Sequence, residues 1–211
     1  MRDMPTVTTF IVGDQLPWSD EVPAADDGGP LDDADLFDGG ARQRCSIRRI
    51  SASGATVRST LRKEAGEAIA VELETGQRKA GRIAWAKGGE LGISFDDKVD
   101  MVALLNRKLV NQPAERRTMP RVEIRCDAFV KFGENLAPAL MRNISARGLQ
   151  LEGADLPPVG TYVAVFVEGL NIPPGEIMWR RGNLAGVEAF EELSWTSIIP
   201  WIKSVIRKPA G

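Results

Sequence analysis

The stretch PALMRNISARGLQLEG, residues 138–153, places Asn143, Ser145 and Gly148 inside a run that otherwise has the character of a β-strand. A second stretch, CSIRRISASGATVRS at residues 45–59, repeats the pattern but has Arg49 in place of Asn143. The two stretches align without a gap when the sequence is shifted against itself by 94 residues. The chain therefore carries the same local pattern twice, with one polar position changed.

The same offset relates residues outside these two stretches. The further matched pairs are Gly66 and Gly160, Val71 and Val165, Trp85 and Trp179, Gly92 and Gly186, and Ile93 and Val187. Recurrence of tryptophan and glycine at one constant spacing indicates an internal repeat. We expect two tandem domains of the same fold.

Each copy has the pattern of short strands. Val, Ile and aromatic residues alternate with polar ones, and Gly or Pro recurs every 8 to 12 residues or so. In the second copy the predicted strands are 122–132, 140–153, 161–169, 174–182 and 184–190. This spacing is typical of an antiparallel barrel or sandwich.

A helical pattern closes each copy, over residues 96–112 and 191–208. In the first helix Val99, Val102, Leu105 and Leu109 form one apolar stripe, which we expect to cover a barrel end or the neighbouring copy. The second helix contains Pro200, which should kink it or end its first half.

The composition is that of a soluble globular protein, with 43% hydrophobic and 27% charged residues. Histidine is absent, which removes the commonest general base and metal ligand, so we expect neither an enzyme nor a metal site. Cys45 and Cys126 are too few for a disulfide framework. With no apolar run of about 18 residues and no signal-peptide pattern, we predict a cytoplasmic protein without a membrane span.

Charge is distributed unevenly along the chain. Residues 14–38 hold nine acidic residues and no basic one, which leaves 27 basic and 20 acidic residues elsewhere, a net charge of +7. The segment has the composition of a solvated linker. Alternatively, it folds back over a basic site and competes with an anionic ligand.

A candidate binding site begins with RRTMPR, residues 116–121, just before the first strand of the second copy. Two arginines at this spacing are a weak signal alone, but Asn143 and Ser145 follow within 24 residues of Arg121. Guanidinium groups bind phosphate and the guanine edge bidentately. Asn143 and Ser145 offer side-chain hydrogen bonds, and Gly148 permits a positive φ or a close backbone approach to a ligand.

These motifs resemble the PilZ domain family, whose members are six-stranded barrels with a C-terminal helix that bind cyclic di-GMP. Residues 116 to about 205 resemble a complete PilZ domain. The resemblance implies that Arg117 and Arg121 hold phosphate and guanine, and that Asn143, Ser145 and Gly148 hold the other side of the ligand. Arg116 is similar to a family position that favours a stacked nucleotide dimer.

The first copy looks like a PilZ domain without the site. Pro23, Asp27 and Arg49 occupy the positions of Arg117, Arg121 and Asn143. An aspartate in place of an arginine repels phosphate, and Arg49 lacks the acceptor of an asparagine. The missing first strand is expected from residues 5–13, across the acidic segment.

The predicted organisation is therefore an N-terminal strand with the acidic segment (1–40), a degenerate PilZ-like domain (41–112) and a PilZ domain with its ligand motif (113–211). The fold class is mainly β, with two tandem antiparallel barrels of about six strands, each followed by a helix.

The predicted function is a cyclic di-GMP receptor that needs no cofactor and acts on a downstream protein partner. The ligand would order a mobile loop at 113–121 and shift the contacts between the domains or with the partner. One alternative is a ligand-independent protein-interaction module. Binding of RNA or single-stranded DNA has little support, because the few aromatic residues lie in core-like strand positions.

Overall fold

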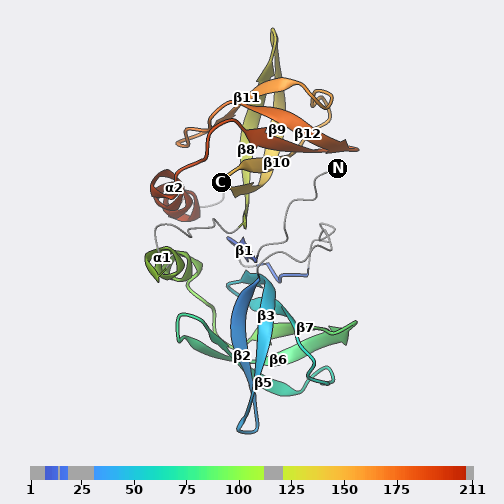
Figure 1. Cartoon of the computed structure of the whole chain (residues 1–211), viewed down its shortest axis with the longest axis vertical. Coiled ribbons are helices and arrows are strands. Elements are labelled where there is room, and N and C mark those ends of the chain that lie inside the picture. The colour runs from blue at the N-terminus through green and yellow to red at the C-terminus, as the bar shows by residue number, and fades with distance from the viewer. Residues whose placement is uncertain (1–7, 14, 19–30, 112–120, 208–211) are drawn as a thin grey trace. The chain divides into compact units, whose positions relative to one another are not determined.

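The computed structural model describes residues 8–13, 15–18, 31–111 and 121–207. The chain divides into two compact units, Met1–Glu115 and Arg116–Gly211. Both are built mainly from β-strands, and in each the strands are followed by a helix (Figure 1). The helices in the described parts of the chain are too short or too polar to cross a membrane.

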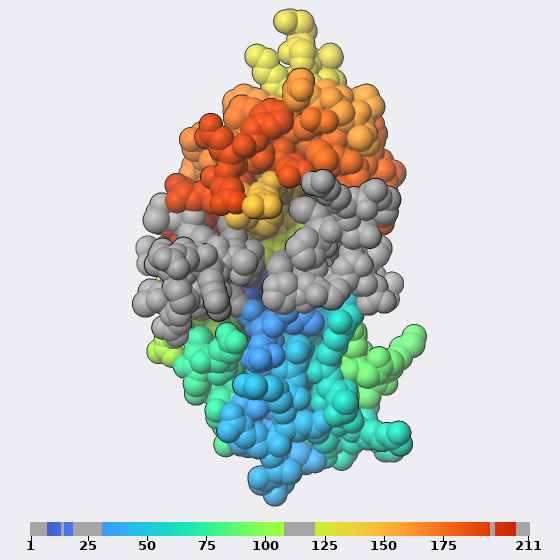
Figure 2. All heavy atoms as spheres, in the orientation of Figure 1, coloured from blue at the N-terminus to red at the C-terminus, as the bar shows by residue number. Residues whose placement is uncertain are grey.

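Six strands of the second unit close into a barrel. They are β8 (Arg121–Phe132), β9 (Asn135–Ser145), β10 (Gly148–Glu152), β11 (Tyr162–Val167), β12 (Gly175–Arg181) and β13 (Leu184–Ala189). The antiparallel pairings run β8–β9–β10–β13–β12–β11 and return to β8. The predicted antiparallel barrel is therefore confirmed. The hairpin of β8 and β9, yellow in the figures, projects beyond the rest of this unit (Figures 1 and 2).

The first unit closes in the same order. Its strands are β1 (Thr9–Ile11), β2 (Asp32–Asp38), β3 (Ala41–Ser51), β4 (Gly54–Arg58), β5 (Ala68–Leu73), β6 (Arg78–Lys87) and β7 (Glu90–Phe95). The antiparallel pairings run β2–β3–β4–β7–β6–β5 and return to β2. These two rings of strands are called the first and second barrels below.

The offset of 94 residues holds in three dimensions. It relates both ends of β3 to β9, of β4 to β10, of β5 to β11 and of β7 to β13. It also relates backbone hydrogen bonds outside the strands: Val99 N donates to Ala52 O, and Leu193 N to Ala146 O, each at 2.8 Å. The matched residues seen in the sequence are therefore matched positions in one fold.

In both barrels a tryptophan of the repeat packs against a glycine of the repeat on the neighbouring strand. In the second barrel, a Cβ on Gly186 would lie 2.0 Å from Nε1 of Trp179, and the matched pair Gly92 and Trp85 has the same arrangement at 2.2 Å. Each indole therefore packs directly on a glycine of the neighbouring strand. Any larger residue would displace the indole.

Three expectations from the sequence are corrected. Residues 140–153 are two strands, because β9 ends at Ser145 and β10 begins at Gly148. Asp32–Asp38, expected in a linker, is barrel strand β2, with Ala34 and Leu36 buried in the core. Pro200 does not end the first half of its helix, one of the two effects expected of it, since α2 continues from Trp195 to Arg207. Buried Trp201 fixes that helix to its barrel, with its Nε1 donating to the backbone oxygen of Glu168 at 2.9 Å.

The first strand of the first barrel is divided in two. β1 runs parallel to β3 and places Thr9 and Phe10 opposite Arg49 and Ile50. In the second barrel, the start of β8 holds the matching positions beside β9 and runs antiparallel to it. Strand β1, within the residues expected to supply the whole missing strand, thus forms only one part of it, and β2 forms another part. The first barrel therefore includes β1 and β2, which lie before residue 41, the predicted start of this domain.

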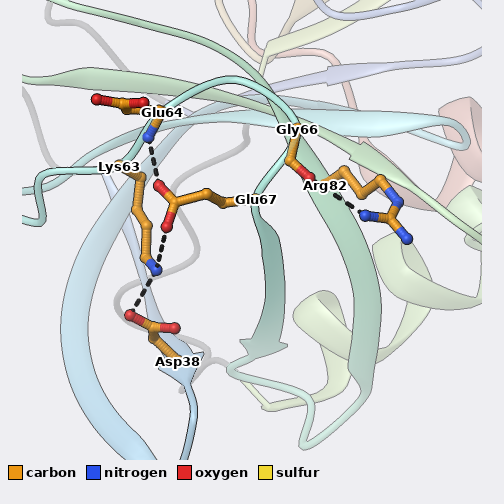
Figure 3. A network of polar contacts seen from close by, with 6 residues as sticks. All are labelled: Asp38, Lys63, Glu64, Gly66, Glu67 and Arg82. Carbon is orange, nitrogen blue, oxygen red and sulfur yellow. Dashed lines mark hydrogen bonds and ion pairs between the residues drawn. The ribbon is translucent and has the colours of Figure 1, made fainter.

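A charged network fastens the loop between β4 and β5 in the first barrel (Figure 3). Lys63 Nζ lies 2.7 Å from Asp38 Oδ2 and 3.0 Å from Glu67 Oε1. Glu67 also accepts a hydrogen bond from the backbone N–H of Glu64 at 2.5 Å. The Arg82 guanidinium donates to the backbone oxygen of Gly66 at 3.2 Å. The second barrel has prolines, Pro157 and Pro158, at the positions of Lys63 and Glu64.

Each unit contains one free cysteine, Cys45 in the first and Cys126 in the second. Burial raises the pKa of the Cys45 thiol to about 12, and burial also raises the pKa of Cys126 to about 11. Since the thiolate is the reactive species, both side chains are poorly reactive while their barrels are folded. They can report the unfolding of each barrel separately.

The helix α1 spans Met101–Asn111, with Met101, Leu104 and Leu105 buried. It begins 94 residues before α2, so the repeat includes the helices as well. Its first turn is capped by Asp100, whose Oδ1 accepts a hydrogen bond from the backbone N–H of Ala103 at 2.9 Å.

Candidate functional site

Arg121 is the first residue of β8 and is already partly enclosed by the barrel. Its Nε is buried and has no hydrogen-bond partner among the residues that the structure describes. Burial lowers the pKa of this guanidinium, an effect that the carboxylate of Glu123 opposes. An enclosed cationic group with an unused donor is costly in the free protein, and an anionic ligand would relieve that cost.

The strand pairing brings the other predicted residues to the same end of β8. Val122, the residue after Arg121, lies opposite Ile144 of β9, and Glu123 lies opposite Asn143. Val122 and Ile144 point into the core and are fully buried, so the alternation of the strands turns Glu123 and Asn143 to the outer face.

Asn143 is held by a residue that the sequence analysis did not single out. Its Nδ2 donates to Oε1 of Gln150, directly opposite on β10, at 2.5 Å. Both side chains are buried although they lie on the outer face of the barrel. The hydrogen bond fixes the amide of Asn143 in one orientation, which a binding site requires.

Ser145 and Gly148 form the turn between β9 and β10. The Ser145 hydroxyl donates to the backbone oxygen of Gly148 at 3.1 Å. Gly148 does not adopt a positive φ, which was one of the two roles expected of it. Glycine is needed because a Cβ would lie 2.0 Å from the backbone oxygen of Val187 on β13. The matched Gly54 has the same restriction, at 2.4 Å from the oxygen of Ile93, so this position serves the fold in both barrels.

The outer face continues from Asn143 across three more strands. Gln150 lies opposite Gly186 of β13, and Gly186 lies opposite Trp179 of β12. Amide groups and an indole ring packed on glycine therefore follow one another across the barrel. This row is called the amide–indole face and consists of Glu123, Asn143, Gln150, Gly186 and Trp179. It offers hydrogen bonds at one end and an aromatic surface at the other.

The matching face of the first barrel is covered by its own N-terminal segment. Pro17 is buried, and its Cδ lies 3.4 Å from the position that a Cβ on Gly54 would take. Trp18 packs edge-on against Trp85, with ring centroids 6.0 Å apart. The first barrel thus differs from the second in two ways: Pro17 and Trp18 cover this outer face, and Arg49 replaces Asn143.

The structure brings together four of the six predicted ligand residues: Arg121, Asn143, Ser145 and Gly148. Arg116 and Arg117 lie outside the described residues, as does the loop at 113–120. Residues 19–30 of the acidic segment also lie outside them. Gln150 was missed, although a glutamine between two leucines in a predicted strand is a signal for a polar site on the outer face.

Within the described ranges, His, Cys, Asp and Glu side chains form no group of three or more that could hold a metal ion. The candidate site contains guanidinium, amide, hydroxyl and carboxylate groups and the indole of Trp179, which can bind a ligand through charge, hydrogen bonds and stacking.

The family model described as PilZ domain matches residues 115–198. Residues 115–198 are a PilZ domain. The match covers the second barrel and most of the residues leading to it, including Arg116 and Arg117. The first barrel lies outside the match, so its interpretation as a degenerate PilZ-like domain rests on the internal repeat and stays a prediction.

The solved structures to which the chain is similar include the following three. One is Borreliella burgdorferi PlzA in complex with c-di-GMP, with 12% identity, a TM-score of 0.33, and coverage of 82% of this chain and 86% of that chain. The Bacillus subtilis inhibitor of motility (MotI/DgrA) has 14% identity, a TM-score of 0.30, and coverage of 85% and 100%. Escherichia coli YcgR in complex with c-di-GMP has 11% identity, a TM-score of 0.26, and coverage of 83% and 82%. No curated protein matches the chain.

Proposed function

We propose that the PilZ domain of this chain binds cyclic di-GMP and that the protein is a receptor for this second messenger. The observation that carries the proposal is the partly enclosed guanidinium of Arg121, whose Nε lacks a partner among the described residues. It lies at the end of β8 where Asn143 and Ser145 come together. Cyclic di-GMP is a dianion with two guanine bases, so it matches both the cation and the hydrogen-bonding groups.

Each site residue has a role in this proposal. Arg117 and Arg121 hold phosphate and guanine, while Asn143 and Ser145 bind the opposite side of the ligand. Asn143 meets the ligand with its orientation already set by Gln150. Arg116 contacts a second, stacked nucleotide when two ligands bind. Gly148 keeps β10 close to β13, which holds the turn in place.

The first barrel contributes no second site of this kind. Arg49 stands in place of Asn143, and Pro17 and Trp18 occupy the matching outer face. These contacts support the proposal that the first barrel keeps the fold for a structural or protein-binding role. The predicted stoichiometry therefore counts the second barrel alone.

The first test is isothermal titration of the full chain with cyclic di-GMP, beside the Arg117→Ala variant. We expect saturable binding that Arg117→Ala abolishes, and no comparable binding of cyclic GMP, which carries one phosphate and one base. A stoichiometry near one indicates a single ligand, and a value near two indicates the stacked dimer and assigns Arg116 to it. A wild-type chain that binds no cyclic di-GMP contradicts the proposal and favours the ligand-independent interaction module.

We further propose that the ligand acts as a switch by ordering the segment 113–121, where the two arginines lie. Binding would gather Arg117 and Arg121 against β9, and this would change the contacts that the protein makes with the first unit or a protein partner. The expected result is slower proteolytic cleavage within 113–121 in the presence of cyclic di-GMP. Cleavage elsewhere in the chain is the internal control. Equal cleavage rates with saturating ligand and without it contradict the switch but leave the binding proposal intact.

A further inference from the structure

The outer surfaces of the two barrels differ sharply in polarity. The large hydrophobic side chains that are exposed in the described residues all belong to the second unit: Phe129, Leu136, Val159, Tyr162, Phe166, Met178 and Phe190. Single exposed apolar residues are ordinary, but a contiguous group marks an interaction site. The strand register joins two of them, Phe129 and Phe166, directly.

Three neighbouring strands of the second barrel, β9, β8 and β11, bring apolar side chains into one row. Phe129 of β8 lies directly opposite Phe166 of β11 on one side and Pro138 of β9 on the other. Phe129 is 49% exposed and Phe166 is 52% exposed. This row, Pro138–Phe129–Phe166, is called the phenylalanine row. It crosses the outer face of the barrel at right angles to the strands.

The internal repeat supplies a matched comparison for this row. Subtraction of 94 places Arg44, Asp35 and Glu72 at the positions of Pro138, Phe129 and Phe166. The register is the same, since Asp35 lies opposite Arg44 on one side and Glu72 on the other. One fold therefore carries a charged row in the first barrel and an apolar row in the second. The barrel itself does not require the phenylalanines.

One acidic and one basic residue flank the phenylalanine row on β8, and their positions indicate which kind of partner fits this face. Asp127 and Lys131 are exposed on β8, two residues before and two residues after Phe129. Leu136 and Ala164 lie opposite Lys131 on the neighbouring strands, and Leu140 lies opposite Asp127. The face is thus apolar at its centre, with one acidic and one basic residue at equal distances along the same strand.

That arrangement is complementary to itself. In a symmetric dimer the two-fold axis lies in the plane of the interface, and each protomer uses the same patch. An axis along the phenylalanine row places Phe129 against its own counterpart and Lys131 against the partner's Asp127, twice. Leu136 then meets the partner's Leu140. We propose that this face binds a second molecule of the chain and forms a two-fold symmetric dimer.

The proposal is independent of ligand binding, because the phenylalanine row and the amide–indole face involve different residues. It predicts a dimer whose central contacts are aromatic and whose flanking contacts are opposite charges. Aromatic residues that are desolvated at the centre of such an interface contribute most of its binding free energy. The flanking charges set the orientation of the two protomers.

The test is sedimentation velocity of the full chain over a series of protein concentrations. We expect a reversible dimer that Phe166→Glu weakens by about tenfold or more. Glu72 already occupies this position in the first barrel, so the fold accommodates the substitution. The control is Met178→Glu on β12, since Met178 is as exposed as Phe129, at 49%, but lies outside the row. It should leave the dimer unchanged.

A charge exchange tests the assigned symmetry. Asp127→Lys and Lys131→Asp should each weaken the dimer, because each places like charges opposite one another. An equimolar mixture of the two variants should dimerise again as a heterodimer, in which both charge pairs are restored. A wild-type chain that is monomeric at all concentrations overturns the proposal. So does a dimer that Phe166→Glu does not weaken, or a mixture that sediments like the separate variants.

Discussion

Replacement of Arg121 with methionine is expected to reduce cyclic di-GMP affinity by about a hundredfold or more, without loss of stability. A hydrogen bond to a charged group contributes about 1.5–3 kcal/mol, and a guanidinium makes two in a bidentate contact. Each 1.4 kcal/mol or so is a factor of ten in affinity. Isothermal titration of the folded variant measures the change.

The stability of Arg121→Met separates a ligand contact from a structural role. Burial lowers the pKa of Arg121 and leaves its Nε without a partner among the described residues, so the free protein gains little from the charge. Methionine keeps a similar side-chain length without the buried cation. The melting temperature should therefore be equal to or higher than that of the wild type.

The matched control for this variant is Arg125→Met. Arg125 lies on the same strand, β8, but is exposed, so the variant removes one positive charge outside the proposed site. We expect its affinity to change only slightly. An Arg121→Met protein that binds like the wild type would remove Arg121 from the site, and one that fails to fold would assign it to the structure instead.

The repeat made most of the fold predictable. The tryptophan and glycine positions that recur across neighbouring strands serve the same purpose in both barrels, as Trp85 on Gly92 and Trp179 on Gly186 demonstrate. Because glycine and tryptophan constrain one another across neighbouring strands, their spacing survives in the sequence. Strand β2 was missed because its seven residues include four aspartates, and only Ala34 and Leu36 point into the core. Composition indicated a linker where a period of two was present.

The candidate site was predictable only in part. Arginine, asparagine and serine are visible as motif residues, but their supports depend on pairing between strands. Gln150 orients Asn143 only because β9 and β10 place the two side chains opposite one another. Pro17 and Trp18 cover the first barrel by contacting residues that are distant in the sequence, Gly54 and Trp85. No local sequence pattern predicts such contacts. Gly148, by contrast, is visible in the sequence as a motif residue, but the close approach of Val187 on β13 is enough to explain why glycine is needed there.

Replacement of Gly148 with alanine is accordingly expected to destabilise the second barrel by about 1–3 kcal/mol or more. The new Cβ would lie 2.0 Å from the oxygen of Val187 and 3.1 Å from its carbonyl carbon, and both are backbone atoms. β13 would have to move away from β10, which strains the closed ring of strands. For a domain of this size, each kcal/mol lowers the melting temperature by roughly 4–8 °C.

The two cysteines allow each barrel to be followed separately in the same molecule. Alkylation along a denaturant gradient should report an earlier transition for Cys126 in Gly148→Ala, with the Cys45 transition unchanged. Gly54→Ala should do the opposite, because its Cβ would lie 2.4 Å from the oxygen of Ile93 in the first barrel. Gly133→Ala is the control for backbone strain, since Gly133 has a φ of +54° and nothing within 4 Å of its Cβ position. If Gly148→Ala is no more destabilising than Gly133→Ala, the close approach of β10 and β13 does not explain this glycine, and a direct role at the ligand becomes the better explanation.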